Sequence, residues 1–543
     1  MKSFVSSLAL FAASTFALPQ QLSSLEGRAL SPYAPVTTPC PSNSPVRKAN
    51  DVSSAESSYI QQRQTKANAA LAAWLTKTDS TFPTTNLPIV GITTSGGGYR
   101  SLLTGAGVLQ ALDARDGNTS LSGLYQGFTY QAGLSGGAWL LSSISGNNWP
   151  TITSLKTNLW ETAFEESLFD PDGALLAVAD AVITNDIAAK SAAGFNPTLT
   201  DPYGRLLAYQ LLSGNDGGVS DTLHGLTSNS NFTSQAVPYP ILTSIGVNTD
   251  VGQCTPSSNG TQYELHPYEF GSWDSGVGAF IQTQYLGTSA SNGSPVNGTC
   301  HTNYDNLGYA LGTSSNLFNE VCISDPTLSG LSSNLTTELT NFLGAGHQLV
   351  TRDEYAVYPN PFQNYPGATS VSNQTELSLV DGGETDQNNP IWPFLHRPNV
   401  AVLFVNDNSA DTSDNYPNGS ELYNTYQIAK SDGLTRMPVI PPDTTFVSQG
   451  LNIRPTFFGC NTQNTLTLIY LPNHNYTYDS GVSTAKLQYS KTETDALIAN
   501  GVAVGSYNGN GTFAECVGCA ILKKTGGTLP SKCQSCFSSY CYN

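Results

Sequence analysis

A serine flanked by glycines is placed by its neighbours to act as a nucleophile. The pentapeptide at 133–137, Gly-Leu-Ser-Gly-Gly, matches the pattern G-x-S-x-G around Ser135. In that pattern the glycines allow a tight strand-to-helix turn, which holds the serine hydroxyl clear of the backbone. An apolar stretch at 128–132 precedes the motif, and a helix is expected at 138–144. A purely structural turn is the alternative, because the motif is short and the chain contains 50 glycines.

A second glycine-rich turn, Ser-Gly-Gly-Gly-Tyr-Arg at 95–100, follows an apolar stretch at 87–94 and precedes a helix expected at 99–113. The turn lacks the Gly-Lys-Ser/Thr ending of a P-loop, and Ser101 replaces the third glycine of a dinucleotide fingerprint. The remaining interpretation is a loop whose free amides accept a developing oxyanion at a helix N-terminus. Arg100 could then reach a phosphate or the anionic intermediate, and a surface salt bridge is its alternative role.

A nucleophilic serine requires a base, and the sequence offers two kinds. Asp381 ends an apolar stretch at 377–380 and precedes two glycines, so its carboxylate could serve directly. An aspartate that caps a helix or turn is the alternative at this position. A Ser-acid-His triad would instead use His396 or His474, the two histidines that follow Asp381. Neither histidine has a distinctive catalytic context.

The elements that must position these residues predict an α/β fold. Strand, glycine-rich turn and helix follow one another, which indicates a mostly parallel central sheet flanked by helices. We expect all three glycine-rich turns at the carboxyl ends of such strands, where active sites lie. A further strand is expected at 400–405 and a helix at 51–75, while 150–370 is interpreted as loop and cap insertions. We expect one catalytic domain over 46–543, although about 150 residues per domain would suggest three or four.

The composition limits the classes of partner. The chain has 543 residues, of which 39% are hydrophobic and 10% aromatic, enough for a large packed core and not typical of a disordered chain. Only 11% are charged, and the formal net charge is −18. Such a surface repels polyphosphate, so we expect no nucleic-acid partner and no strong attraction to anionic membranes.

The N-terminal residues have the layout of a secretory signal peptide. Residues 1–17 combine a basic start, an apolar run at 4–11 and a small-residue cleavage context. Residues 18–45, rich in proline and serine, are expected to form an N-terminal arm or propeptide. No later stretch reaches 18 apolar residues, and the polar C-terminus lacks a lipid-anchor tail, so we expect a secreted protein. Ten Asn-x-Ser/Thr sequons predict N-linked glycans: Asn118, Asn231, Asn259, Asn292, Asn297, Asn334, Asn373, Asn418, Asn475 and Asn510.

The cysteines allow either zinc or disulfides at the C-terminus. Two Cys-x-x-Cys pairs, 516–519 and 533–536, are separated by 13 residues, close to zinc-ribbon spacing. After a signal peptide disulfides are favoured, and Cys541 completes a cluster of five within 516–541. Because five is odd, one of them should pair upstream or stay free. The upstream candidates are Cys40, Cys254, Cys300, Cys322 and Cys460.

Together these motifs resemble the fungal phospholipase B/lysophospholipase family, which shares its catalytic fold with animal cytosolic phospholipases and, more distantly, with patatin. The two glycine turns and Leu-Val-Asp-Gly-Gly-Glu-Thr-Asp-Gln-Asn-Asn-Pro at 379–390 carry the resemblance. Further matches lie at 200–205, 268–273 and 312–319 and in the C-terminal cysteine cluster. The similarity extends from about Cys40 to Asn543.

The resemblance implies a role for each candidate residue. Ser135 would be the nucleophile and Asp381 its partner in a dyad without histidine. Gly97 and Gly98 would form the oxyanion hole, and Arg100 would steady the substrate phosphate or the developing anion. The implied reaction is hydrolysis of fatty-acyl esters of lysophospholipids, and of diacyl phospholipids, through an acyl-serine intermediate. It releases free fatty acid and the glycerophospho head group and needs no cofactor and no metal.

The sequence departs from the family pattern at two places, Ala138 where serine is usual and Ser101 where alanine is common. Both could alter the pocket wall, and neither removes a catalytic group. A calcium-binding membrane-docking domain has no counterpart in the sequence, so calcium dependence is not expected. Two rivals remain at this point: a secreted esterase or neutral lipase with a histidine triad, and a glycosylated cell-wall or lectin-like binding protein.

Overall fold

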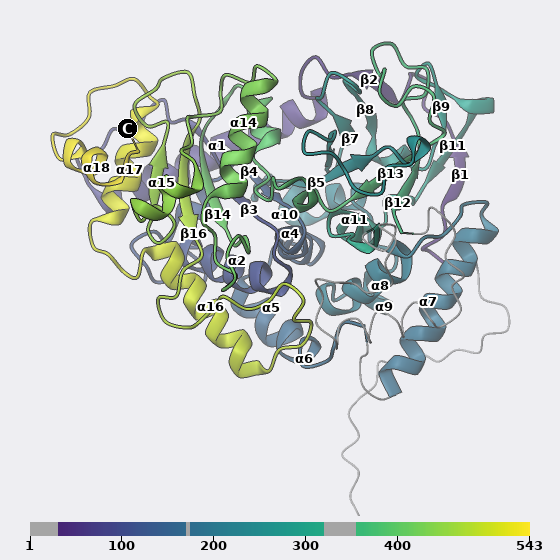
Figure 1. The fold of residues 1–543 in the computed structure, drawn as a ribbon, viewed down its shortest axis with the longest axis horizontal. Helices are drawn as coiled ribbons and strands as arrows, with labels where there is room; N and C mark the ends of the chain where they lie inside the picture. The colour runs from purple at the N-terminus through teal and green to yellow at the C-terminus, as the bar shows by residue number, and fades with distance from the viewer. Residues whose placement is uncertain (1–30, 170–173, 320–353, 543) are drawn as a thin grey trace, which may run out of the picture.

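The computed structural model describes residues 31–169, 174–319 and 354–542, in which helices surround a central sheet (Figure 1). The expected signal peptide at 1–17, Asn334 and Cys322 lie outside the described residues. The helices are α1 Ser54–Thr78, α2 Gly98–Leu112, α3 Leu124–Gly127, α4 Gly136–Gly146, α5 Ile152–Leu155, α6 Glu161–Ala163, α7 Ala174–Ala192, α8 Thr200–Leu211, α9 Asn215–Gly218, α10 Ser230–Thr233, α11 Leu307–Ser314, α13 Trp392–Leu395, α14 Ser420–Ser431, α15 Asp443–Ser448, α16 Lys491–Ser506, α17 Phe513–Lys523 and α18 Cys533–Tyr540.

One large mixed sheet forms the centre of the molecule. Its strands β16, β14, β3, β4 and β5 run parallel, as the sequence predicts, and antiparallel strands extend it on both sides. In sheet order the strands are β15 Thr456–Phe458, β16 Thr467–Pro472, β14 Val400–Asp407, β3 Ile89–Thr94, β4 Tyr130–Gly133, β5 Tyr239–Val247, β6 Gln262–Leu265, β7 Glu269–Ser272, β8 Ala279–Gln282 and β2 Val46–Lys48. Off this path, β13 Glu376–Val380 pairs with β5 and with β12 Ala356–Pro359.

The parallel strands of the sheet are buried, and helices pack against them. Four successive residues of β14, at 402–405, are fully buried, which explains why this strand has a continuous apolar sequence. On one face α2 packs against α4 and α16. Glycines make the α2–α16 contact possible, since a Cβ on Gly107 would lie 2.0 Å from the Ile498 carbonyl oxygen. The two helices therefore meet backbone to backbone.

The structure differs from the sequence prediction in the third glycine-rich turn. β13, which leads to Asp381, is antiparallel to β5, so this turn does not end a parallel strand. The stretch at 150–370 also contributes more than caps, because β5, β6, β7, β8 and β12 belong to the main sheet. Local apolar runs contain no signal for strand direction or sheet membership, and both features depend on partners distant in sequence.

Part of the N-terminal arm is attached to the rest of the molecule. β1 Val36–Pro39 pairs with β11 Thr299–Thr302, and a disulfide joins Cys40 to Cys300 beside that pair. Tyr33 is buried and donates a hydrogen bond of 2.7 Å to Asp201. Residues 31–45 thus form part of the folded body, and the remaining small hairpin joins β9 Ala290–Ser291 to β10 Ser294–Pro295.

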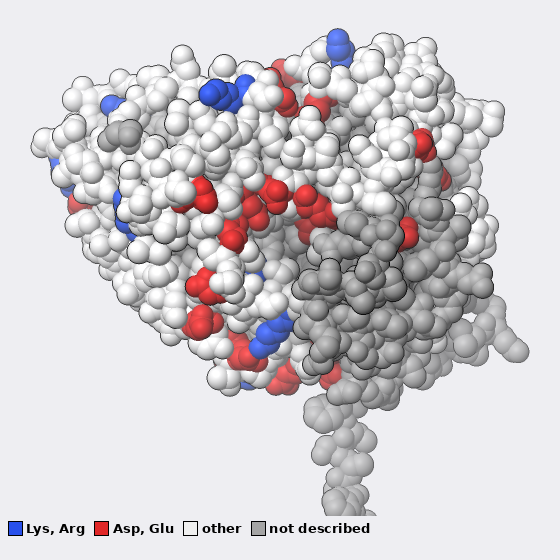
Figure 2. Space-filling view, viewed as in Figure 1, with Lys and Arg blue, Asp and Glu red and all other residues white. Residues whose placement is uncertain are grey.

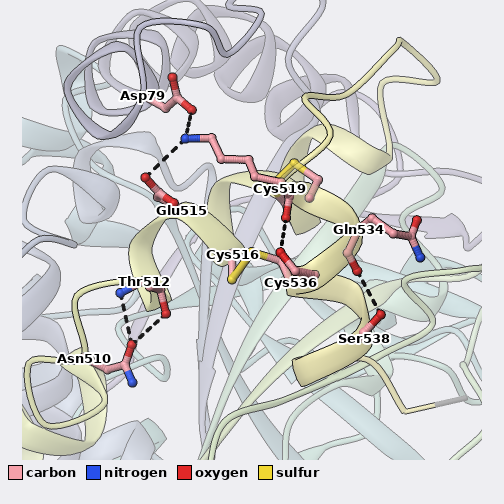
Figure 3. The surroundings of a disulfide bond; sticks show 12 residues. Asp79, Asn510, Thr512, Glu515, Cys516, Cys519, Gln534, Cys536 and Ser538 are labelled. Atoms are coloured by element: carbon pink, nitrogen blue, oxygen red, sulfur yellow. Dashed lines mark hydrogen bonds and ion pairs between the residues drawn. A yellow bond between two sulfur atoms is a disulfide. The ribbon is translucent and has the colours of Figure 1, made fainter.

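The C-terminal cysteines form disulfides, which confirms that prediction over zinc. α17 and α18 are joined by Cys516–Cys536 and Cys519–Cys533 (Figure 3). Of the two outcomes expected for the odd fifth cysteine, pairing upstream or staying free, the structure shows the first, through Cys460–Cys541. Lys532 forms ion pairs with Asp79 and Glu515, which ties this segment to the end of α1.

The surface reflects the acidic composition. On the face shown in Figure 2, acidic side chains gather in a band across the middle, and few basic side chains accompany them. Within the described ranges, no helix is both long enough and apolar enough to span a bilayer.

Candidate active site

Ser135 stands on the strand-to-helix turn that its motif predicts. It follows β4 and caps α4 with φ 51° and ψ −122°, a strained backbone for a residue other than glycine. The flanking glycines are sterically required, because a Cβ on Gly133 would lie 2.3 Å from the Gly137 carbonyl oxygen, and one on Gly137 would lie 2.2 Å from that of Thr94. The Ser135 residue is 6% exposed.

Asp381 follows β13, a strand that runs toward the end of β4 at which Ser135 lies. β4 ends opposite Leu242 of β5 and β13 ends opposite Ile245. Because β6 pairs with both of these β5 residues, β4 and β13 share the other edge of β5 and point toward each other. Ser135 and Asp381 follow the two strand ends, so the topology brings the predicted nucleophile and base together.

Side-chain contacts support this convergence. A Cβ on Gly382 would lie 2.6 Å from Cδ1 of Leu134, so the neighbours of Asp381 and Ser135 touch. The Asp381 carboxylate accepts a hydrogen bond of 2.8 Å from the Gly383 N–H, and the residue is 4% exposed. Asp381 therefore also caps the short 3₁₀ turn at 382–385, so its two interpretations are compatible.

The Gly97–Gly98 turn lies against the Ser135 turn. Gly97 and Gly98 have φ values of 131° and 57°, conformations that glycine adopts without strain. A Cβ on Gly136 would lie only 2.1 Å from the Gly98 carbonyl oxygen, so the two turns are in backbone contact. Among the described residues, no protein group accepts a hydrogen bond from the Gly97 or Gly98 N–H. Two amide donors are thus available next to the nucleophile.

Arg100 lies behind this loop and not on the surface, which rules out the surface salt bridge. The residue is 1% exposed, and its guanidinium donates to the carbonyl oxygens of Asn408 at 2.9 Å and Val482 at 2.6 Å. A Cβ on Gly97 would lie 2.6 Å from Nη2 of Arg100. Burial lowers the Arg100 pKa to about 10, so the side chain stays cationic at neutral pH. The Arg100 guanidinium therefore packs directly against Gly97 and supports the Gly97–Gly98 turn.

Asn388 connects the Asp381 loop to the Gly97–Gly98 turn. Its Oδ1 accepts from the Gly96 N–H at 3.0 Å, its Nδ2 donates to Ser409 Oγ at 2.9 Å, and its own N–H donates to Glu421 Oε2 at 3.1 Å. Burial and the neighbouring Asp411 raise the Glu421 pKa well above its ordinary value. Asn388 lies within the family-like stretch at 379–390. Nothing in the sequence marked Glu421 as a residue near the site.

The two positions that depart from the family pattern are both fully buried. Ala138 lies in the first turn of α4, and Ser101 donates from Oγ to the Ser95 carbonyl oxygen at 2.5 Å. Ser101 therefore links the first turn of α2 to Ser95, where the glycine turn begins. Ala138 contributes to the apolar packing of α4.

His396 is placed away from the nucleophile. Its ring stacks on Trp273 at a centroid distance of 5.6 Å. The neighbouring Arg397 guanidinium lies 5.6 Å from the ring centre of Tyr130, the first residue of β4. Because Ser135 lies two residues beyond the last residue of β4, Gly133, the structure places His396 by the opposite end of that strand. Burial lowers the His396 pKa to about 4.

His474 lies at the correct edge of the sheet but several strands away. It follows β16, and strands β14 and β3 stand between β16 and β4. Three strand spacings of about 4.8 Å amount to roughly 14 Å, beyond the reach of a hydrogen bond to Ser135. The His474 ring packs against Tyr416 and Tyr476 instead. The structure thus brings together the five residues predicted for the dyad mechanism and separates both histidines from them.

No group of three or more His, Cys, Asp or Glu side chains suited to hold a metal ion occurs in the part of the chain that the structure describes.

Comparison with known proteins identifies the family. The lysophospholipase catalytic domain matches residues 90–543. Lysophospholipase 1 of Aspergillus fumigatus is 37% identical over 94% of this chain and 87% of its own length. Lysophospholipase 1 of Saccharomyces cerevisiae is 37% identical over 94% of this chain and 83% of its own. Probable lysophospholipase 5 of Schizosaccharomyces pombe is 36% identical over 96% and 89%.

The fold is also that of a solved phospholipase structure. Human GIVD cytosolic phospholipase A2 superposes with a TM-score of 0.70 at 16% identity, covering 91% of this chain and 72% of that one. This likeness confirms the predicted architecture of a central sheet flanked by helices. With its relatives at 36–37% identity over nearly the whole chain, the protein belongs to the lysophospholipase catalytic-domain family and is a hydrolase of that family.

Proposed function

We propose that this protein is a secreted phospholipase B/lysophospholipase that works through a Ser135–Asp381 dyad. Its substrates are the fatty-acyl esters of lysophospholipids and of diacyl phospholipids. The observation that carries the proposal is the meeting of β4 and β13 on one edge of β5, beside a turn with two available amides. The proposal assigns the roles of nucleophile, base and oxyanion site to residues that lie where these two strand ends and the turn meet.

The reaction proceeds in two stages. Asp381 takes the proton of Ser135 as its oxygen attacks the ester carbonyl, and the Gly97 and Gly98 amides bind the oxyanion. One such donor contributes about 3–4 kcal/mol in comparable sites. The ester C–O bond then breaks, and the leaving alcohol takes the proton from Asp381. Water activated by the same carboxylate hydrolyses the acyl-serine, releases the fatty acid and restores the free serine.

Secretion and glycosylation form part of the proposal. Four described disulfides suit an oxidising compartment. Most of the described sequons also have an exposed asparagine, accessible to a glycosyltransferase. The exposed sequon residues are Asn118, Asn259, Asn292, Asn297, Asn373, Asn475 and Asn510. Mass spectrometry of the secreted protein before and after deglycosylation tests these sites and identifies the mature N-terminus.

Fatty-acid release from lysophosphatidylcholine at pH 5 with EDTA tests the catalytic proposal. Wild type is compared with Ser135→Ala, Asp381→Asn and a His396→Gln/His474→Gln double variant. We expect both dyad variants to lose activity by several orders of magnitude and the histidine variant to retain it, without need for calcium. A carboxylate with a reference pKa of about 3.9 stays ionised at pH 5, where an ordinary histidine is largely protonated.

Three results would contradict this proposal. A folded but inactive histidine variant would favour the triad mechanism of a neutral lipase. A wild-type protein that releases no fatty acid would remove the substrate assignment. An unreactive Ser135 toward a fluorophosphonate probe would favour the binding-protein alternative.

A further inference from the structure

The segment at 314–316, Ser-Ser-Asn, contacts both predicted catalytic residues through their backbones. It begins at Ser314, the last residue of α11, and is buried throughout. The Ser135 N–H lies 3.1 Å from the Ser314 carbonyl oxygen and 3.1 Å from Ser314 Oγ, so both oxygens accept from it. The Asp381 N–H donates to the Asn316 carbonyl oxygen at 2.9 Å. The backbone amides of Ser135 and Asp381 are therefore both bound by this segment, through acceptors that lie two residues apart.

The segment is itself fixed on both sides. Ser314 Oγ donates to the Thr243 carbonyl oxygen at 2.6 Å, and Thr243 lies in the stretch of β5 between the ends of β4 and β13. The Asn316 side chain donates to Thr200 Oγ1 at 2.9 Å and to the carbonyl oxygen of residue 354 at 3.0 Å. Its Oδ1 accepts from the Phe318 N–H at 2.8 Å. The acceptors for Ser135 and Asp381 are thus anchored to the sheet and to α8.

Such anchoring has a physical purpose at a strained turn. A non-glycine residue with φ 51° and ψ −122° persists only where its surroundings over-determine it. Each productive step also requires the Ser135 hydroxyl and the Asp381 carboxylate at a fixed separation, and an error of about 1 Å costs on the order of 100-fold in rate. A rigid segment that binds both backbones can hold that separation.

We propose that Ser314 and Asn316 are positioning residues that set the spacing between Ser135 and Asp381. The inference rests on the proposed function and adds residues to it that contact the catalytic pair only through the backbone. Neither residue had an assigned role in the sequence, although both lie within the family-like stretch at 312–319.

Ser315 provides a matched control from the same segment. It is also a buried serine, 4% exposed, but its hydroxyl faces other partners. Ser315 Oγ accepts from Trp139 Nε1 at 2.8 Å and from the Tyr203 hydroxyl at 3.1 Å, and it donates to the Leu311 carbonyl oxygen at 2.9 Å. Removal of its hydroxyl therefore costs buried hydrogen bonds without touching the Ser135 amide.

The experiment compares Ser314→Ala and Asn316→Ala with Ser315→Ala. Three quantities are measured for each variant: kcat and KM on lysophosphatidylcholine, the rate of Ser135 phosphonylation by a long-chain fluorophosphonate, and the thermal unfolding midpoint. We expect Ser314→Ala to lower kcat and the phosphonylation rate by about tenfold, with KM within about threefold of wild type. Asn316→Ala should act in the same direction, and Ser315→Ala should leave both rates within about threefold.

Two results would overturn the positioning role. One is wild-type kcat and phosphonylation in folded Ser314→Ala, and the other is an equal loss of both rates in Ser315→Ala, which would indicate general destabilisation. Asn316→Ala decides nothing alone if it fails to fold, because Ser314→Ala carries the test. The phosphonylation rate also separates this proposal from the proposed function. If wild type is phosphonylated at Ser135 but releases no fatty acid, the substrate assignment fails, and the phosphonylation rates of the variants still test the positioning role. If wild type is not phosphonylated, both proposals fail.

Discussion

Arg100 shows how burial decides what a charged residue does. Its guanidinium donates to two backbone carbonyl oxygens from distant parts of the chain, those of Asn408 and Val482, and it lies directly behind Gly97. Arg100 is 1% exposed. A substrate phosphate would therefore have to displace this packing to reach the guanidinium. The family resemblance leaves open whether Arg100 steadies the substrate phosphate or the developing anion. Packing behind Gly97 fits the second role, exerted through the glycine turn, better than direct contact with phosphate.

Substitution of Arg100 separates these two roles. Arg100→Lys keeps the charge but cannot reproduce the fork that reaches both carbonyl oxygens. We expect kcat/KM to fall by at least about tenfold on lysophosphatidylcholine, and by a similar factor on a monoacylglycerol, which has no phosphate. Kinetics on both esters provide the measurement. A loss confined to the phosphate-bearing ester would show that Arg100 contacts the phosphate.

At the scale of elements, the sequence predicts the parts of the site formed by local patterns. The helices and strands around the two glycine turns begin and end within a few residues of their predicted limits, because an apolar strand, a glycine turn and a helix are encoded side by side. The direction of β13 is not encoded in this way, since it depends on pairing with β5 more than 100 residues earlier. The roles of Asn388 and the 314–316 segment depend on equally distant contacts, so only the family resemblance marks those stretches.

The contact between the two glycine turns leads to a prediction for Gly136. Its missing Cβ would lie 2.1 Å from the Gly98 carbonyl oxygen and 2.7 Å from the Gly98 nitrogen, and backbone atoms cannot yield as a side chain can. Gly136→Ala should push the amides of this turn away from the reacting carbonyl. Because loss of one oxyanion donor costs about 100- to 1000-fold, we expect kcat to fall by about that factor.

Gly511→Ala is the control for this change, because a Cβ at Gly511 meets no atom within 4 Å. Steady-state kinetics and circular dichroism of both variants provide the measurement. Wild-type activity in a folded Gly136→Ala variant would show that Gly98 does not take part in the oxyanion site.

At the scale of the whole molecule, the disulfides should contribute unequally to stability. Cys40–Cys300 closes a loop of 260 residues and holds β1 against β11, whereas Cys516–Cys536 spans only 20 residues. In the chain-entropy description, the longer loop adds about 2 kcal/mol more stabilisation, because cross-linking distant residues restricts the unfolded chain more strongly. We therefore expect a Cys40→Ser/Cys300→Ser variant to show the larger drop in thermal unfolding midpoint. We expect kcat near wild type at 25 °C, because both disulfides join segments that contain none of the candidate catalytic residues. A Cys516→Ser/Cys536→Ser variant is the comparison, and it retains Cys519–Cys533 between the same two helices. Equal drops in the two variants would indicate that strand pairing and the burial of Tyr33 hold the N-terminal arm without the covalent link.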